Sequence, residues 1–360
     1  MVYNQIMKVL GLALVALLAA ASGFLVYSRV SKISSPSIKM LERYNRWKLK
    51  FGKLHATPAE NHYRFQIFVK TAELVDEDNI FYSKWALENG YGILESPMFA
   101  LQAHSDLSAE EFKKKYLGLD INKAKDVELS ELPKDLKLPE QNLAQSSYLP
   151  RVKNQGECGS CWAFSTAATL EKQYFDKYRV QVDLSQQDLV DCSEDDNGCD
   201  GGWPASTYYH VSSNGIAMEI DYPYRGSQGN CIKTSKLKSG RTTIGGEIIS
   251  KTLAYTHATA QSMAKMGIVA GLAIAAGGRF SRADFTNNKV FDPNAFSGEC
   301  KLSIDHAVNL GGADAKYAII HNSWGTSWGT KGRGLVAPCT NGLLGTPAYI
   351  THTYSKLPTV

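Results

Sequence analysis

The sequence predicts an α+β protein built from two folded units. Three observations lead to this prediction: residues 38–118 place apolar side chains at helical intervals, a long apolar helix is expected from Cys161 onward, and β-forming residues dominate after Arg241. With 360 residues, 44% hydrophobic content and a formal charge of +4, the chain can bury a substantial core. The weak positive charge gives no reason to expect a nucleic acid as a partner.

The first 28 residues predict a membrane-targeting segment. Lys8 precedes twenty uncharged and mostly apolar residues, 9–28, and Arg29 follows them. Small residues at 19–23 are typical of a signal-peptide cleavage site, whereas the apolar residues at 24–27 extend the run toward the length of a bilayer. Residues 1–28 are therefore expected to be a signal peptide or a signal anchor. Both would deliver the chain to the secretory pathway, for a lysosome-like or vacuole-like compartment or for the outside of the cell.

Residues 38–118 predict a separate helical unit that contains no cysteine. Tyr44, Trp47 and Phe51 recur at intervals of three and four, as on the apolar face of an amphipathic helix. Further along, the stretch DLSAEEF from Asp106 predicts an N-cap followed by acidic residues in a first helical turn. Residues 119–139 alternate charged residues with isolated leucines and contain two prolines, so they predict an exposed linker.

Residues 140–360 contain all seven cysteines and predict the stable domain. A core helix is expected to begin near Cys161, and Ser185 is expected to cap a second helix over QQDLVDC. The stretches TTIGGEII, GIVAGLAIAA and KYAIIHNSWG predict strands. A cleft between the helical half and the sheet half is the expected place for a functional site.

The stretch NQGECGSCWAFS places Cys158 and Cys161 three residues apart. A structural zinc site would need a second such pair, and the sequence has none. A thioredoxin-type redox pair would need a βαβ pattern, which the following residues do not show. We therefore expect no metal and no cofactor, and consider a third possibility, a nucleophilic cysteine beside a structural one.

A nucleophilic cysteine needs a histidine as base and a third group that orients it. The segment IDHAVNL offers His306, about 145 residues after Cys161, and HNSWGTSWG offers Asn322 sixteen residues further on. A thiol at a helix N-terminus beside an imidazolium has a lowered pKa and is a stronger nucleophile as its thiolate. An amide can orient the imidazole without adding a competing negative charge.

On these motifs the chain resembles the papain family of cysteine proteases, in its cathepsin L-like branch. The resemblance implies that Cys161 is the nucleophile, His306 its base and acid, Asn322 the orienting group and Gln155 a donor of the oxyanion hole. Trp324 would shield the hydrogen bond between Asn322 and the histidine. The implied fold is a helical left domain packed on a β-barrel-like right domain.

The resemblance also implies the disulfides and the substrate cleft. The implied disulfides are Cys158 with Cys199, Cys192 with Cys231, and Cys300 with Cys339. Gly201 and Gly202 would form the edge that pairs with the extended substrate backbone. The implied pocket for the second residue upstream of the cut consists of Trp203, Pro204, Leu272, Ile304, Ala307 and Leu344. Because this pocket is apolar, we expect an endopeptidase that prefers Leu, Phe or Val there.

The helical unit at 38–118 resembles the inhibitory propeptide of the family. Its first motif appears as Glu60, Arg64, Ile67, Phe68, Val75 and Asn79, with Thr71 in place of the usual Asn. Its second motif is altered to Ala100, Gln102 and His104 before a retained Asp106. We hypothesise that acid protonates ion-paired carboxylates, such as Glu60 with Arg64, and so loosens the propeptide.

The expected function is that of a lumenal cysteine endopeptidase, made as an inactive zymogen. Its expected partners are protein and peptide substrates and its own propeptide, with a membrane bound only through the N-terminal segment; we expect a monomer. The mature N-terminus is expected near residues 132–141. The alternative is a non-catalytic homologue that serves as a binding or inhibitory scaffold.

Overall fold

The computed structural model describes residues 38–92, 94–124, 149–242, 248–265, 269–339, 343–344 and 349–355. The expected targeting segment, most of the linker at 119–139 and the expected mature N-terminus lie outside these residues. The chain divides into two compact units, Met1–Thr71 and Ala72–Val360. Within the described ranges, no helix has the length and apolarity that a membrane span requires.

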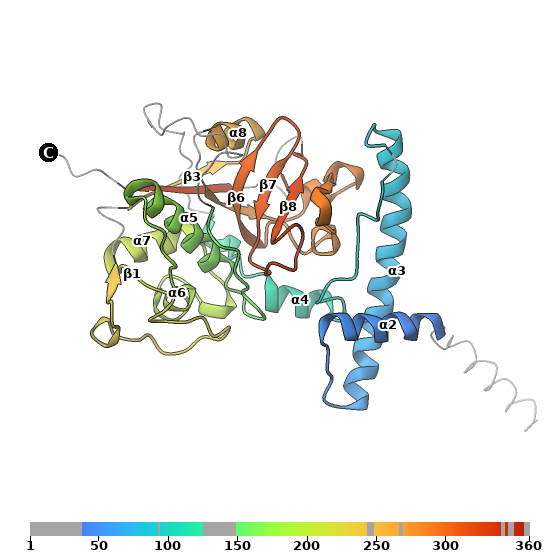
Figure 1. The fold of residues 1–360 in the computed structure, drawn as a ribbon, viewed down its shortest axis with the longest axis horizontal. Coiled ribbons are helices and arrows are strands. Elements are labelled where there is room, and N and C mark those ends of the chain that lie inside the picture. The colour runs from blue at the N-terminus through green and yellow to red at the C-terminus, as the bar shows by residue number, and fades with distance from the viewer. Residues whose placement is uncertain are drawn as a thin grey trace, which may run out of the picture. The chain divides into compact units, whose positions relative to one another are not determined.

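The first unit consists of α2 (Ile38–Phe51) and the beginning of α3 (Pro58–Glu88). Figure 1 shows α2 lying across α3. The predicted apolar face of α2 forms this contact. Tyr44 and Trp47 are buried, and their ring centroids lie 5.0 and 5.1 Å from the ring centroid of Phe68. The aromatic spacing in the sequence therefore predicted the packing of this helix pair correctly.

The second unit begins with the remainder of α3, followed by α4 (Ala109–Tyr116) and a short 3-10 turn, Ile121–Ala124. The predicted helix start at DLSAEEF is found, and its N-cap is Ser108. The Ser108 hydroxyl accepts a hydrogen bond from the Glu111 amide, and the Glu111 carboxylate accepts one from the Ser108 amide. This reciprocal capping satisfies two amides that a helix start leaves unpaired.

The helical half of residues 140–360 contains α5 (Cys161–Tyr178), α6 (Gln186–Cys192) and α7 (Pro204–Asn214). The helix predicted from Cys161 is α5, and the predicted cap Ser185 accepts a hydrogen bond from the Asp188 amide in α6. Trp162, Leu170, Leu189 and Tyr208 belong to one buried cluster that joins the three helices. A two-stranded sheet, β1 (Ile216–Ala217) and β2 (Arg241–Thr242), completes this half.

The other half is a seven-stranded sheet in the order β3-β9-β4-β6-β7-β8-β5. Its strands are β3 (Ile248–Ala254), β4 (Ala270–Ile274), β5 (Val290–Phe291), β6 (His306–Ala313), β7 (Ala318–His321), β8 (Arg333–Val336) and β9 (Tyr349–Ser355). All neighbours are antiparallel except β5 and β8. Two of the predicted strands are found, because GIVAGLAIAA contains β4 and KYAIIHNSWG contains β7. The third, TTIGGEII, overlaps β2 at Thr242 and β3 at Ile248 and Ile249, and its residues 243–247 lie outside the described part of the chain. The mixture of helices and sheet confirms the α+β fold class.

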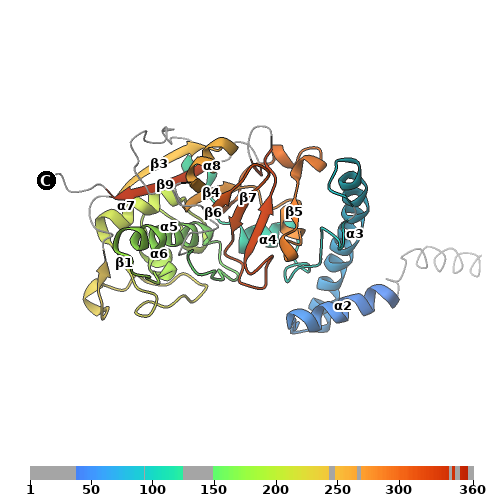
Figure 2. The same ribbon diagram turned by 45° about the horizontal axis from the view of Figure 1, so that its top comes forward.

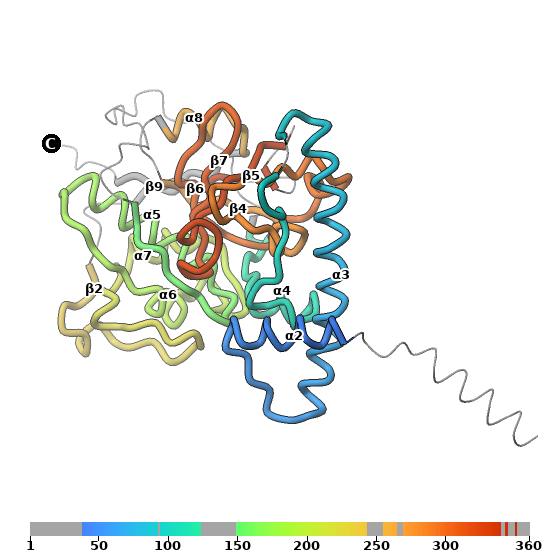
Figure 3. The backbone as a smooth tube through the Cα atoms, turned by 45° about the vertical axis from the view of Figure 1, so that its right-hand side comes forward, coloured from blue at the N-terminus to red at the C-terminus, as the bar shows by residue number. Residues whose placement is uncertain are grey.

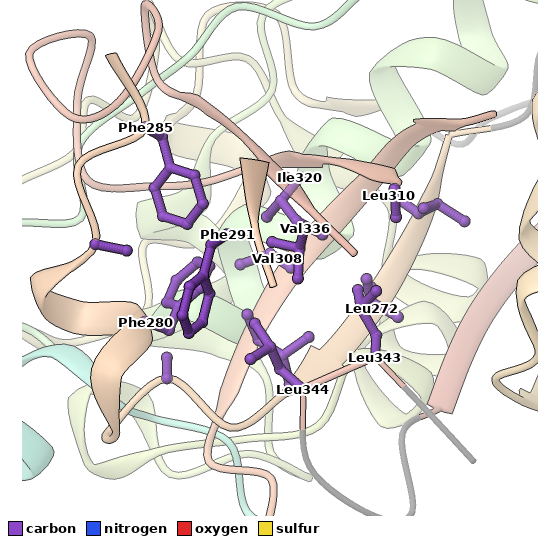
Figure 4. Close-up of a cluster of buried hydrophobic side chains, with 14 of the residues drawn as sticks. Leu272, Phe280, Phe285, Phe291, Val308, Leu310, Ile320, Val336, Leu343 and Leu344 are labelled. Carbon is purple, nitrogen blue, oxygen red and sulfur yellow. The ribbon is translucent and has the colours of Figure 1, made fainter. Parts of the chain in front are cut away.

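The large core lies on the sheet and is closed by helix α8 (His257–Lys265) and by short 3-10 turns. Figure 4 shows its apolar side chains, Leu272, Phe280, Phe285, Phe291, Val308, Leu310, Ile320, Val336, Leu343 and Leu344. The 3-10 turns of this half are Arg279–Arg282, Thr286–Asn288, Pro293–Ala295 and Glu299–Lys301; the helical half contains two more, Gly198–Asp200 and Thr234–Lys236.

Helix α5 connects the two halves, because it lies alongside β4 and β6 (Figures 2 and 3). The Ser165 hydroxyl donates a hydrogen bond of 2.9 Å to the Val308 carbonyl. In return, the Asn309 side-chain amide donates one of 2.9 Å to the Ser165 carbonyl. These buried bonds set the position of α5 relative to β6, and so bring the first residue of the helix close to the first residues of the strand.

Three disulfides are present: Cys158–Cys199, Cys192–Cys231 and Cys300–Cys339. They are the three pairs that the family resemblance implies. The seventh cysteine, Cys161, is a free thiol and is buried. A disulfide of this kind typically adds about 2 to 4 kcal/mol to the free energy of unfolding. Cys158–Cys199 lies next to the free thiol and ties the chain before α5 to the chain before α7.

Candidate active site

The free thiol of Cys161 lies at the first residue of α5, where unpaired backbone amides favour a negative charge. The backbone amides of Ala307, Gly118 and Trp162 hydrogen-bond to it. Ala307 directly follows His306 in β6, so its bond to the thiol places the first residue of α5 beside the first residues of β6. The structure thus brings together two residues that are far apart in the sequence.

The imidazole of His306 is held by Asn322. Its Nε2 atom lies 2.9 Å from the Asn322 Oδ1 atom, which also accepts a hydrogen bond from the Ser323 amide. Because Oδ1 can only accept, Nε2 must carry the proton in this bond. Nδ1 is then free of a proton, and it has no hydrogen-bond partner among the described residues. This tautomer is the one that can take a proton from a thiol.

Trp324 covers this pair. Its ring centroid lies 4.9 Å from that of His306, with 30° between the planes. Trp324 is itself buried, and it packs against Phe280 and Trp328 of the sheet half. The tryptophan expected to shield the histidine–asparagine bond therefore lies stacked on the histidine.

Burial favours the uncharged forms of both reacting groups. Burial raises the pKa of the Cys161 thiol to about 11, against the opposing effect of the three amides. Burial also lowers the pKa of His306 to about 4, although its bond to Asn322 acts in the other direction. With the site covered, the pair is thus a neutral thiol and a neutral imidazole at physiological pH.

The side chain of Gln155 is fixed by three hydrogen bonds close to the start of α5. Its Nε2 atom donates hydrogen bonds of 3.1 Å to the Tyr116 carbonyl and 3.0 Å to the Cys158 carbonyl. Its Oε1 atom accepts a bond of 2.6 Å from the Ser323 hydroxyl, which fixes the orientation of the amide. The donor expected for an oxyanion is therefore aimed at the carbonyl of Tyr116, the last residue of α4.

The chain after α4 runs over the site as an extended segment. The Gly118 carbonyl accepts a hydrogen bond of 2.9 Å from the Gly202 amide, and the Gly202 carbonyl accepts one of 3.0 Å from the Asp120 amide. The two segments are parallel where they meet. Gly118 has no room for a side chain, since a Cβ atom there would lie 1.7 Å from the Gly159 carbonyl oxygen. Gly202, expected as a backbone-pairing edge, thus pairs with this segment.

Leu119 occupies an apolar cluster beside the thiol. The buried members of the cluster are Leu119, Cys161, Trp203, Ala273, Ile304 and Ala307. Three of the expected pocket residues, Trp203, Ile304 and Ala307, are therefore found together next to Cys161. Pro204, the first residue of α7, is buried next to Trp203.

Two of the expected pocket residues lie elsewhere. Leu272 and Leu344 belong to the large core of the sheet half, where both are buried (Figure 4). Ala273 takes the place expected for Leu272 and is paired with Ala307 across β4 and β6. Successive residues of a strand face opposite sides of the sheet, so a shift of one position moves a side chain from pocket to core. The expected pocket is corrected accordingly.

Asp196 supports the same edge and was not expected from the sequence. Its carboxylate accepts hydrogen bonds from the Trp203 amide at 2.9 Å and from the hydroxyls of Ser193, Ser206 and Thr207 at 2.6, 2.9 and 3.0 Å. The carboxylate thus caps the start of α7 and fixes the chain that carries Gly202. An acidic residue ahead of a Pro-started helix is the signal that could have indicated it.

The altered second propeptide motif also lies at the site. A ring nitrogen of His104, Nε2, lies 3.0 Å from the Ser281 carbonyl oxygen. The imidazole packs among aromatic rings, tilted against Phe112 at a centroid distance of 4.5 Å and edge-on to Trp324 at 5.8 Å. His104 therefore contacts the indole that covers His306.

The second half of α3 contacts the 3-10 turn Arg279–Arg282 through ion pairs. Asp78 is 5% exposed and pairs with Arg279 at 2.8 Å and Arg282 at 2.9 Å. Glu299 pairs with Arg279 as well, at 3.1 Å. In the first unit, the Glu60 carboxylate accepts a hydrogen bond of 2.9 Å from the Ala56 amide. Asp78 is thus an ion-paired carboxylate that the acid-loosening hypothesis did not name.

In the part of the chain that the structure describes, no group of three or more His, Cys, Asp or Glu side chains is arranged to hold a metal ion.

Comparison with known families gives two matches. Residues 138–345 match the papain family cysteine protease, and residues 44–112 match the cathepsin propeptide inhibitor domain (I29). Together the two matches cover both the helical precursor region and the region that holds Cys161, His306 and Asn322.

Similar individual proteins belong to the same family. The chain is 32% identical over 336 residues to cathepsin L 2 of Paramecium tetraurelia, covering 91% of this chain and 98% of that protein. It is 32% identical over 300 residues to papain of Carica papaya, covering 82% and 80%. The solved structure of a digestive procathepsin L2 proteinase from Tenebrio molitor superposes with a TM-score of 0.70, covering 88% and 99% of the two chains. At 24% identity, that structure supports the fold alone.

Proposed function

Because this chain belongs to the papain family of cysteine proteases and carries a cathepsin propeptide inhibitor domain, we propose that Cys161, His306, Asn322 and Gln155 carry out its hydrolysis of peptide bonds. One observation supports this assignment above the others. His306, fixed by Asn322 at 2.9 Å as the tautomer with a free Nδ1, lies next in sequence to Ala307, whose amide contacts the Cys161 thiol.

The reaction begins with a proton transfer. Once the covering segment leaves, water enters the site, and the penalty that burial imposes on the charged forms falls. The Cys161 proton then moves to Nδ1 of His306, which gives a thiolate and an imidazolium. The N-terminus of α5 stabilises the thiolate.

The thiolate next attacks the carbonyl carbon of the substrate and forms a carbon–sulfur bond. The resulting oxyanion accepts hydrogen bonds from Gln155 Nε2 and from the Cys161 amide, and one such donor is worth about 3 to 4 kcal/mol. His306 gives its proton to the leaving amine, and the peptide bond breaks. A water molecule, deprotonated by His306, then attacks the thioester; the acid product leaves and the thiol is restored.

Substrate specificity follows from the cluster that Leu119 occupies. The apolar residues Trp203, Ala273, Ile304 and Ala307 line the pocket that Leu119 occupies. It would accept Leu, Phe or Val two residues upstream of the cut, with the substrate backbone paired to Gly201 and Gly202. Cleavage within polypeptides, as an endopeptidase, is the activity that we propose.

The chain is a precursor whose own propeptide is an intramolecular inhibitor. The segment from Tyr116 to Asp120 contacts Gln155, Cys161 and Gly202, so it covers the thiol, the oxyanion donor and the pairing edge together. We propose that activation cuts the linker at 119–139 and that the mature domain begins near residues 132–141.

We propose the secretory pathway as the location, with a lysosome-like compartment or the outside of the cell as the destination. Three disulfides support this, because such bonds persist in oxidising compartments. Residues 1–28 would act as a signal peptide or a signal anchor, and the mature protease would be a monomer. N-terminal sequencing of the precursor and of the mature protein tests both boundaries.

Labelling with a thiol-directed epoxide tests the assignment of the nucleophile. We expect the mature domain to be labelled at one position and the label to be lost in Cys161→Ala. A non-catalytic scaffold of the same fold is the alternative; it would fold and bind peptides but stay unlabelled, and that result would overturn the proposal.

A further inference from the structure

Helix α2 has an apolar stripe on the face opposite Tyr44 and Trp47. Ile38, Leu41 and Leu49 are 78%, 47% and 83% exposed, and their spacing of three and then eight residues places them on one side of a helix. The two aromatic residues on the other side are already buried. The stripe is therefore not the side of α2 that holds the helix pair together.

The stripe continues past the end of the helix. Leu54 is 96% exposed, and with Leu49 and Asn45 it lines a hollow that also includes Lys48, Gly52 and Lys53. Gly52 has a positive φ of 61°, which turns the chain so that Leu54 comes beside Leu49. Leu49 and Leu54 thus lie together at the surface, and Ile38 and Leu41 add two more exposed apolar side chains of a kind that soluble proteins normally bury.

Basic residues flank the stripe. Residues 38–54 contain six Lys or Arg residues and one acidic residue, Glu42. Lys39, Arg46 and Lys50 are exposed, and Glu42 lies 4.0 Å from Arg46 in a pair whose side chains are 62% and 72% exposed. Such a pair is weak in water, so it leaves the surface strongly positive.

We propose that the outer face of α2, formed by Ile38, Leu41, Leu49 and Leu54 with Lys39, Arg46 and Lys50, docks onto a membrane surface rich in anionic phospholipids. The apolar side chains would enter the boundary between headgroups and acyl chains, while the basic side chains contact phosphate and carboxylate groups. A positive amphipathic helix is complementary to such a surface in both respects.

The sequence beside α2 also favours a membrane over a protein partner. Nine residues, 29–37, separate the uncharged and mostly apolar run 9–28 from Ile38. Nine extended residues reach at most about 30 Å, so an anchor retained at 9–28 would hold α2 within that distance of the bilayer. The proposal concerns the precursor alone and does not depend on the protease activity.

Photo-crosslinking in vesicles tests the docking. The full chain with Cys161→Ala, which prevents self-processing, is reconstituted into vesicles of phosphatidylcholine with about one third phosphatidylserine. A photoreactive amino acid replaces Leu49 in one sample. In the matched control it replaces Ile80, which is 76% exposed on α3. Both positions are open to solvent, so neither substitution disturbs a core.

We expect lipid adducts at position 49 to exceed those at position 80 at least fivefold. The excess should fall to the control level in vesicles of phosphatidylcholine alone, and in the variant Lys39→Glu, Arg46→Glu, Lys50→Glu. Equal adducts at the two positions would overturn the proposal, as would adducts to a second copy of the chain. An excess that survives charge reversal would also refute the anionic-lipid assignment. Epoxide labelling of the processed protease reports separately on the catalytic proposal.

Discussion

The Nε2 atom of Gln155 donates a hydrogen bond of 3.1 Å to the carbonyl oxygen of Tyr116. Tyr116 is the last residue of α4, in the propeptide, whereas Gln155 is the donor that we assign to the oxyanion of the reaction. A carbonyl of the inhibitor thus occupies the hydrogen-bond donor that a substrate carbonyl would use. Two residues after Tyr116, the backbone of Gly118 passes directly over Gly159, where there is no room for a side chain.

Gln155→Ala should lower kcat of the activated protease by about 100-fold to 1,000-fold, with a small change in KM, because the donor acts on charge that develops only in the transition state. Steady-state kinetics on a peptide substrate measure both constants. Ser323→Ala removes only the hydroxyl that holds Oε1 of the glutamine, so it should cost less. An unchanged kcat in Gln155→Ala would remove Gln155 from the mechanism.

Asn322→Ala should lower kcat by about 10-fold to 100-fold, since a hydrogen bond to a group that becomes charged contributes about 1.5 to 3 kcal/mol. Without its partner on Nε2, the His306 ring can turn, and the imidazolium loses an acceptor. The lost acceptor should also lower the pKa of His306 in the mature enzyme. The pH profile of kcat/KM therefore serves as a second readout, and an unaltered profile with unaltered kcat would contradict the role.

Alkylation of Cys161 should depend on pH differently before and after activation. In the precursor, burial raises the thiol pKa to about 11, so the reactive thiolate is scarce below that pH and increases as pH rises toward it. In the mature enzyme the thiolate should already exist at neutral pH. Iodoacetamide rates, followed by mass spectrometry at several pH values, compare the two forms. A precursor that reacts as fast as the mature enzyme at pH 7 would refute this reading.

His104→Ala should weaken the propeptide, because it removes the ring that packs against Phe112 and Trp324 and the contact to the Ser281 carbonyl. We expect the purified precursor to process itself faster by a factor of about 5 to 10, because the loss of one aromatic contact costs about 1 kcal/mol of binding free energy. His62→Ala, at an exposed position of α3, is the control and should process at the original rate. Equal rates for both variants would mean that His104 does not hold the inhibitor.

Asp78→Asn should accelerate processing at neutral pH, because it removes the negative charge that pairs with Arg279 and Arg282. The variant tests whether this ion pair holds the propeptide in place. Processing rates of the two precursors at pH 7 and pH 5 form the experiment. If the original precursor processes equally fast at both pH values, the acid hypothesis fails whatever the variant does.

Local sequence patterns predicted several of the helices and strands correctly. The aromatic spacing of α2, the cap Ser185 and the helix start at Cys161 follow from contacts within a few residues, which a single stretch of sequence contains. The expectations for Leu272 and Leu344 failed for the opposite reason. Which face of β4 lines the pocket depends on its register with β6, and register is a property of two strands.

The sequence by itself determined the class of the protein and the chemistry available to it. The motifs around Cys161, His306 and Asn322 are specific to one family, and they can be recognised without the fold. Only the tertiary structure decided what surrounds them. Asp196 under the substrate edge, Ala273 in the pocket and Asp78 between two arginines gain their roles from partners that are remote in sequence. The Tyr116 carbonyl reaches Gln155 for the same reason: chain packing brings residues 39 positions apart within hydrogen-bond distance.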